Sequence, residues 1–340
     1  MPLLKILILP PSVGLFIYVL RLANPGAVFV NVLTIGTVGV VVVFCVYLAV
    51  FILDSITWHL ALTPLPVTGL WLYRSWKVRM VGEAWNMVLP AGGMGGEPLK
   101  AVLLKSRYGL DYRESIASLI LARTINLIAL VFFLGVGFVL ILLRPILPMS
   151  LTVPAGIGLG TFIIVIFSFF AVQRWQIASR FFGLLSRTVI GSRIKVMLHY
   201  VEDIDHRLMV FYTQWRARFF YAVLLAMGAW ILCALETYYV ASFLGLSISL
   251  RDAWIVESMV QMVRAGTFFI PASIGVQEGI FLVAFTSLGV PSQIAMAVAM
   301  VKRGQEIAWI VWGGILGLSH LLPAKGYKGY KGYQVCNKQD

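Results

Sequence analysis

Long uninterrupted hydrophobic stretches dominate the chain. Residues 32–53 and 156–172, for example, contain no charged side chain. An α-helix rises about 1.5 Å per residue, so about 20 apolar residues cross about 30 Å of hydrocarbon. The pattern therefore predicts an all-α polytopic membrane protein with one transmembrane domain over residues 1–322. We expect about six transmembrane helices, near residues 3–22, 33–58, 116–142, 154–172, 218–243 and 292–322.

Two polar, glycine-containing segments interrupt this pattern. They read "LPAGGMGGEPLK" over 89–100 and "IPASIGVQEG" over 270–279. The flanking apolar pieces, such as 81–89 and 279–290, are too short to cross a bilayer alone. Each segment therefore predicts the tip of a re-entrant hairpin. Irregular backbone at membrane depth is tolerated only where protein buries it or where it lines a watery cavity.

The two interruptions form an internal repeat. Glutamate follows proline by seven residues in both, and an arginine follows the glutamate by 26 residues in one and 25 in the other. We place the repeats at about 78–142 and 252–322. Three spans separate the hairpins, so they enter from opposite sides and the repeat is inverted, a transporter arrangement. The matching residues are Pro90, Glu97 and Arg123, and Pro271, Glu278 and Arg303.

Composition and charge agree with a membrane protein. The chain is 60% hydrophobic and only 12% charged, which excludes an ordinary soluble domain. The net charge of +13 is concentrated in residues 74–113, 173–218 and the tail. Because positive loops stay in the cytoplasm, we expect both termini there. We expect amphipathic cytoplasmic helices over 173–218 and a disordered tail over 323–340.

Ionisable residues within the apolar segments are the candidate functional groups. Each costs about 2.5 to 3.5 kcal/mol at the bilayer centre, so each should pair or face water. One hypothesis places Arg123 and Arg303 in a central cavity, binding an anionic head group. Glu97 and Glu278 would orient these arginines or titrate during transport. The alternative is that they form static Arg–Glu pairs that hold the repeats together.

The remaining candidates follow from the same segments. Asn86 and Asn126 complete the substrate-binding set, with hydrogen bonding between helices as their alternative role. Residues at the tips and in the last span form the gating or coupling set. That set comprises Glu97, Glu278, Pro90, Pro271, Gly93, Gly96, Gly275 and Glu306.

Several kinds of chemistry lack their usual motifs. The glycine segment does not end in the Gly-Lys-Ser/Thr of a nucleotide-binding loop. The charged run at 199–206 has the composition of a solvated helix face, and three scattered cysteines imply neither a disulfide framework nor a zinc site. We therefore expect no catalytic residue, metal ion, cofactor or nucleic-acid partner.

The quoted segments resemble a known family. "NMVLPAGGMGGEPLKAVLLK", "SLILARTINL" and "IPASIGVQEGIF" are similar to the transmembrane region of lysylphosphatidylglycerol synthases. They also resemble the stand-alone flippase-like proteins of that family, including those associated with hopanoid gene clusters. The resemblance implies a bacterial inner-membrane protein that lacks the aminoacyltransferase domain. Its partners would be membrane lipids: anionic phospholipids, hopanoids or polyprenyl lipids.

The expected function is a flippase-like transfer, between leaflets, of a lipid with an anionic or polar head group. One alternative is an enzyme or accessory subunit in lipid modification or in hopanoid or polyprenyl lipid biosynthesis. Its candidate carboxylates would be Glu97, Glu278, Asp203 and Asp205. Another is a partner that docks a biosynthetic enzyme through residues 173–218. A third is a channel for small solutes or ions.

Overall fold

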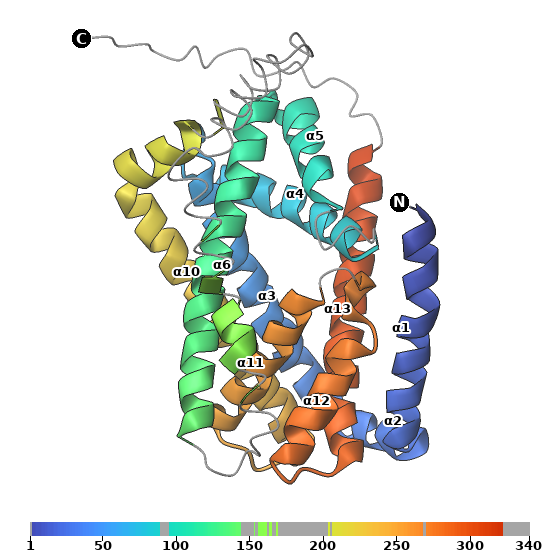
Figure 1. The fold of residues 1–340 in the computed structure, drawn as a ribbon. Coiled ribbons are helices and arrows are strands. Elements are labelled where there is room, and N and C mark those ends of the chain that lie inside the picture. Colours follow the sequence, from blue (N-terminus) through green and yellow to red (C-terminus); the bar gives the residue numbers. More distant parts are fainter. Residues whose placement is uncertain are drawn as a thin grey trace, which may run out of the picture.

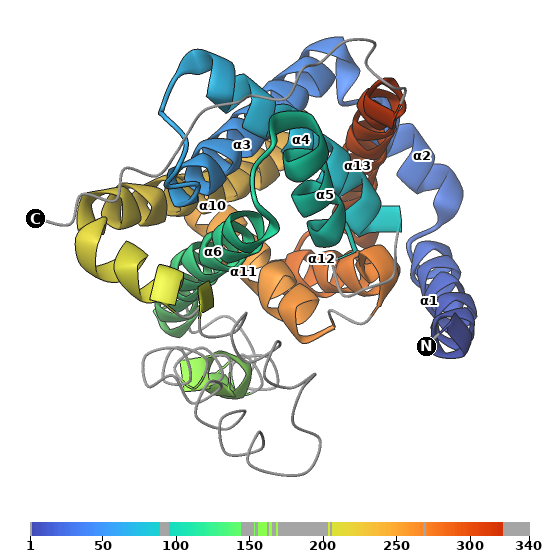
Figure 2. The same cartoon turned by 90° about the horizontal axis from the view of Figure 1, so that it is seen from above.

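Every regular element in the described part of the chain is a helix (Figures 1 and 2). The computed structural model describes residues 2–88, 95–143, 153, 156–161, 163–164, 168, 203–204, 206–267 and 270–321. The main elements are α1 (Pro2–Leu22), α2 (Pro25–Leu33), α3 (Gly36–Ala61), α4 (Gly69–Val88), α5 (Glu97–Tyr108), α6 (Tyr112–Leu142), α10 (Arg216–Phe243), α11 (Leu250–Gly266), η1 (Pro271–Ser273), α12 (Val276–Ser287) and α13 (Ser292–Leu321).

The predicted all-α polytopic fold is confirmed. Within the described residues, α3, α6 and α10 are each long and apolar enough to cross a membrane. α13 is equally long, with 30 residues, but carries Lys302, Arg303 and Glu306 in its middle. The predicted span at 154–172, the interval 173–218 and the tail 323–340 lie mostly or wholly outside the described residues.

The first span continues into a short helix that the hydrophobic pattern did not reveal. α1 and α2 together are apolar enough to cross a membrane, but they meet at an 81° bend. At the bend, Asn24 has a φ of 58° and precedes Pro25, the first residue of α2. Asparagine tolerates this left-handed region, and proline suits the first position of a helix. The turn at Asn24 and Pro25 thus redirects an otherwise continuous apolar run.

Two helical hairpins occupy opposite halves of the bundle. α4 and α5 form one hairpin in the upper half of Figure 1, and α11, η1 and α12 form the other in the lower half. α4 also contacts η1, so the two hairpins meet inside the molecule. The order of these helices agrees with two helical hairpins, whereas their re-entrant course, their inversion and the repeat boundaries at 78–142 and 252–322 stay predictions.

The bundle is apolar on the outside and holds its charges inside. The outer face exposes large apolar side chains such as Val41, Phe132 and Ile315. A buried apolar cluster joins α2, α10, α11, α12 and α13 through residues that include Phe281, Phe285 and Met296. Charged side chains such as Lys100 and Glu278 are instead buried. Charges therefore gather where helices face one another rather than lipid.

Glycine allows the first hairpin to close. A Cβ atom on Gly96 would overlap the backbone carbonyl of Gly82 in α4. The Gly96 N–H donates to Asn86 Oδ1 at 2.6 Å, which ties the start of α5 to α4. Glycine at 96 therefore sets the separation of the two arms.

We predict that Gly96→Ala lowers the thermal unfolding midpoint in detergent. The added methyl has no flexible side chain to displace, so the arms must separate at a cost of about 1 to 3 kcal/mol. Gly135→Ala in α6 is the matched control, because its Cβ would meet no atom within 4 Å. The control should be neutral or slightly stabilising. Equal midpoints for both variants would show that the close approach does not matter.

Candidate functional site

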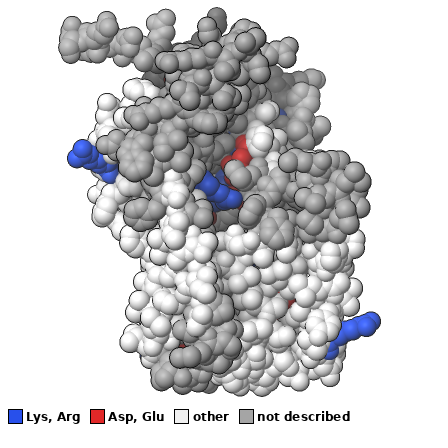
Figure 3. All heavy atoms as spheres, in the orientation of Figure 1, with Lys and Arg blue, Asp and Glu red and all other residues white. Residues whose placement is uncertain are grey.

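A cavity of about 280 Å³ lies within the bundle. Helices α3, α4, α5, α6, α10, α11 and α13 all contribute to its lining. On the face shown in Figure 3, a recess exposes basic and acidic atoms above a broad belt that is almost free of visible charge. The ionisable residues that line the cavity are Tyr47, Asp54, Arg79, Glu83, Glu97, Lys100, Arg123, Cys233, Glu236, Glu257, Arg264, Lys302 and Glu306.

The first hairpin contributes a network centred on Lys100. Its Nζ donates to Glu83 Oε1 at 2.9 Å and to Glu97 Oε1 at 3.0 Å. The Lys100 side chain is only 3% exposed, and its stem packs against Gly82. Asn86 also donates to Glu83, at 3.2 Å. Lys100 thus joins α5 to α4 through Glu83, and Glu97 on its own helix shares the same ammonium group.

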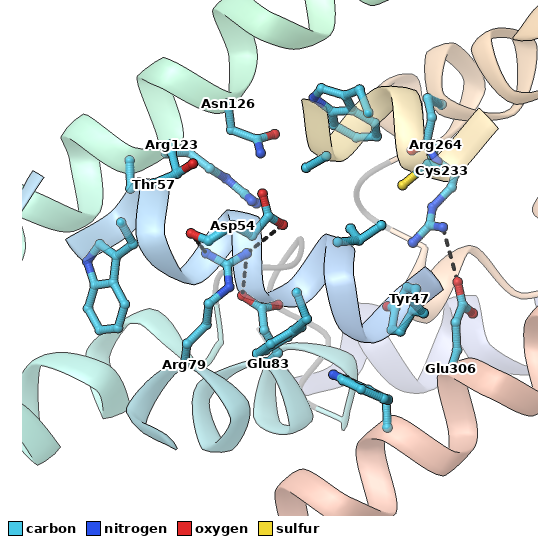
Figure 4. Close-up of a pocket in the computed structure, with 18 of the residues that line it drawn as sticks. Tyr47, Asp54, Thr57, Arg79, Glu83, Arg123, Asn126, Cys233, Arg264 and Glu306 are labelled. Carbon is cyan, nitrogen blue, oxygen red and sulfur yellow. Dashed lines mark hydrogen bonds and ion pairs between the residues drawn. The ribbon is translucent and has the colours of Figure 1, made fainter. Parts of the chain in front are cut away.

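A second ion pair connects this hairpin to α3. Arg79 donates to Asp54 Oδ2 at 3.0 Å and to the Asp54 carbonyl at 3.3 Å. Arg79 also lies 3.9 Å from Glu83, one helical turn away. Its guanidinium therefore bridges two carboxylates on adjacent helices, as Figure 4 shows.

Arg123 projects from α6 toward this group (Figure 4). Its side chain is exposed and lines the cavity. Asn126 lies about one helical turn further along the same helix and lines the cavity too. A guanidinium beside an amide offers several donors to an anionic head group.

The second hairpin contributes a different network. Arg303 contacts Glu278 Oε1 at 2.7 Å through Nε, and Glu306 at 2.8 Å through a terminal nitrogen. Glu306 also accepts from Arg264 at 3.1 Å (Figure 4). Glu278 in turn accepts the N–H of Gly275 at 2.8 Å, capping the start of α12. Arg303 reaches the tip itself, through the Ala272 carbonyl at 3.0 Å.

The tip of this hairpin has a strained backbone. Ala272 and Ser273 have φ values of 48° and 49°, unusual for residues that carry a Cβ. Gly275 has a φ of 80°, and a Cβ there would crowd the backbone of α1 at Ser12 and Phe16. The Glu278–Arg303–Ala272 contacts hold this irregular segment in place.

The predicted site residues lie in several parts of the structure, and only some of them line the cavity. Arg123, Asn126, Glu97 and Glu306 all line the cavity. Arg303 and Glu278 pair with each other, as the spacing suggested, but they do not line the cavity. Asn86 and Gly96 close the first hairpin through their hydrogen bond. Pro90 and Gly93 lie outside the described residues, and Pro271 begins η1.

Lys100 and Lys302 were absent from the predicted site, although both line the cavity. Arg79 and Arg264 also line the cavity and were not part of the predicted site either. Lys100 follows Glu97 by three residues, a spacing that places the two on one helix face. Lys302 adjoins Arg303 in an apolar span, so two successive basic residues there were the available signal.

We predict that Lys100→Met destabilises the protein much more than Lys105→Met. Both lysines are ion-paired on α5, but Lys100 is 3% exposed and Lys105 is 42% exposed. Removing Lys100 leaves Glu83 and Glu97 without their shared partner, at a cost of about 3 kcal/mol. The exposed pair with Asp111 contributes at most about 1 kcal/mol. Thermal unfolding in detergent measures both, and similar midpoints would contradict the central role of Lys100.

Comparison with known proteins matches this architecture to a family. The family model of the lysylphosphatidylglycerol synthase transmembrane region matches residues 3–313. No curated protein and no solved structure matches the chain. The match spans both hairpins and every helix that lines the cavity. The chain therefore belongs to the lysylphosphatidylglycerol synthase transmembrane-region family.

Proposed function

We propose that the protein transfers a lipid with an anionic or polar head group between the leaflets of the membrane. The observation that carries the proposal is the charged cavity enclosed by an apolar bundle. A head group needs a polar route through hydrocarbon, while the acyl chains need an apolar surface. The apolar outer face and the polar interior meet both needs.

Arg123 and Arg264 are the proposed head-group ligands. They belong to α6 and α11, and both line the cavity. Guanidinium groups bind phosphate oxygens through paired hydrogen bonds. Arg264 now contacts Glu306 at 3.1 Å, so an incoming phosphate would exchange with that carboxylate. Arg264 therefore has an anionic partner before and after the exchange, so neither binding nor release leaves an unpaired charge.

The charges of the lining favour weak, reversible binding. The carboxylates are Asp54, Glu83, Glu97, Glu236, Glu257 and Glu306, and the cations are Arg79, Lys100, Arg123, Arg264 and Lys302. Six negative and five positive charges give a formal sum of −1. An anion therefore meets cations that are already largely compensated. Conduction requires binding that is strong enough to admit the substrate and weak enough to release it.

The hairpins are the proposed gates. They belong to opposite halves of the bundle, and α4 contacts η1 where they meet (Figure 1). Inverted repeats with broken helices commonly alternate access around a fixed central site. Gly96 and Gly275 would permit each tip to move. The contacts of Glu97 and Glu278 would limit that movement.

We also propose a bacterial cytoplasmic membrane location with both termini in the cytoplasm. Basic residues of the loop and helix ends around α5 and α10, such as Lys105, Arg107, Arg216 and Arg218, support this orientation.

We predict that Arg123→Ala slows lipid transfer in liposomes by about tenfold to one hundredfold. Loss of a charge-assisted contact removes about 1.5 to 3 kcal/mol of head-group binding. Fluorescent phosphatidylglycerol is placed in both leaflets, and a membrane-impermeant reductant destroys the label in the outer leaflet. Wild-type protein should allow loss of well over half the label, whereas empty liposomes should retain the inner-leaflet share.

Arg251→Ala is the matched control for this assay. Arg251 is an exposed arginine at the start of α11 and does not line the cavity. It should transfer lipid at the wild-type rate. If liposomes that contain wild-type protein protect as much label as empty ones, the proposed lipid translocation is wrong. An accessory role in lipid biosynthesis then replaces it. A change in the mass of the recovered lipid would indicate an enzyme.

A further inference from the structure

Three buried ionisable residues meet where α10, α11 and α13 come together. Glu236 and Glu257 are each 1% exposed, and Lys302 is 9% exposed. All three line the cavity, but none belongs to the proposed head-group ligands. They form a coupling cluster with two carboxylates and one ammonium group.

Glu257 is fully provided with hydrogen-bond donors. Its Oε2 accepts from Thr237 at 2.6 Å and from Lys302 at 2.8 Å. Its Oε1 accepts from Gln261 at 2.7 Å. Lys302 also donates to the Thr237 hydroxyl at 2.8 Å. Glu257 and Lys302 therefore form a complete, neutral ion pair.

Glu236 has weaker partners than Glu257, among them the side chain of Gln305. Its Oε2 lies 3.9 Å from the Lys302 ammonium, which is already bonded to Glu257. Its Oε1 is buried and has no hydrogen-bond partner within the described part of the chain. The nearby arginines 264 and 303 contact Glu306 and Glu278. An ionised Glu236 would thus be a buried negative charge with little compensation, which is costly.

We propose that Glu236 binds a proton that is transferred together with the lipid. This inference rests on the proposed lipid translocation and adds its energy coupling. The step is a simple acid dissociation: the Glu236 carboxyl O–H breaks, the electron pair stays on oxygen, and the proton passes to cavity water. No other bond changes. Protonation neutralises the carboxyl, and release restores a carboxylate beside Lys302.

Electrostatics couples the proton to the head group. An anionic head group adds negative charge to the same cavity, and a nearby like charge favours the neutral form of a carboxylic acid. Binding of the head group therefore strengthens proton binding at Glu236. Linkage is reciprocal, so the proton strengthens head-group binding equally. One proton and one monovalent anionic lipid together cross without net charge.

The groups that face Glu236 set this behaviour. Lys302 brings a positive charge within 3.9 Å of Glu236, and Glu257 and Glu306 bring negative charges to the same cavity. Cys233 lies one helical turn before Glu236. The polar and ionisable neighbours from every packed element are Cys233 on α10, Tyr47 on α3, Glu257 on α11, and Lys302, Gln305 and Glu306 on α13.

The test measures the steady-state leaflet distribution of fluorescent phosphatidylglycerol in liposomes with a pH gradient. Valinomycin and equal potassium clamp the membrane potential. The phosphodiester is almost wholly ionised, so pH redistributes the lipid only slowly in empty liposomes, which are measured over the same time as the control. With one proton per lipid, we expect about a tenfold ratio between leaflets per pH unit, with enrichment on the alkaline side. Glu236→Gln should give a ratio of about one with or without the gradient.

Asp111→Asn is the matched control, because it removes a carboxylate that is half exposed in the loop before α6. It should keep the wild-type ratio. A wild-type ratio of one, with transfer still fast, would overturn proton coupling and leave translocation intact. A ratio that follows a sodium gradient instead would assign a different ion and also overturn the proposal. If Glu236→Gln does not fold, the wild-type ratio still decides whether a proton is coupled to the lipid.

Infrared spectroscopy separates failure of this inference from failure of translocation. A protonated buried carboxyl has a carbonyl band that an ionised one lacks. The band should be present in wild-type protein at neutral pH and missing in Glu236→Gln. If no lipid crosses but the band is present, translocation fails and proton binding stands. If the band is absent from wild-type protein, proton binding at Glu236 is wrong.

Discussion

The cost of placing a charge in hydrocarbon constrains this structure more than any other interaction. The cavity lining includes eleven formally charged side chains, from Asp54 in α3 to Glu306 in α13. Each needs an opposite charge or water, since lipid supplies neither. Ion pairs such as Lys100–Glu97 and Arg303–Glu278 meet this need inside the bundle. The helices must then face their polar sides inward, which leaves the apolar outer face for lipid.

The broken helices follow from the same constraint. A hairpin tip frees backbone groups from helical hydrogen bonding, and these groups also need partners. Asn86 accepts the N–H of Gly96, while Glu278 accepts the N–H of Gly275. Side chains that pair charges therefore also stabilise the irregular backbone. Movement of a tip would change both sets of contacts together, which links access to the cavity with the state of its ion pairs.

The sequence predicted the features that depend on local pattern. Glycine and proline marked the hairpins, and equal spacing suggested a Glu–Arg pair in each repeat. Glu278 pairs with Arg303, whereas the ion pair of Glu97 is with Lys100. Contacts that depend on how helices pack were not predictable: Arg79 reaches Asp54 from another helix, and Lys302 reaches Glu257 across 45 residues of chain. The repeat also suggested a cavity role for Arg303, whereas Arg264 lines the cavity instead. Local spacing fixes neighbours on one helix but not the rotation of one helix against another.

The central claim is that the charged interior is a watery site that admits an anionic head group. The most direct measurement is the labelling rate of Ala122→Cys by a charged, membrane-impermeant thiol reagent, with Cys45, Cys233 and Cys336 replaced. Ala122 lines the cavity, whereas Phe132 on the same helix is 61% exposed on the apolar outer face. Ala122→Cys should react, more slowly in phosphatidylglycerol than in phosphatidylcholine, and Phe132→Cys should not. An unreactive Ala122→Cys, or a rate that does not depend on the anionic lipid, would contradict the claim.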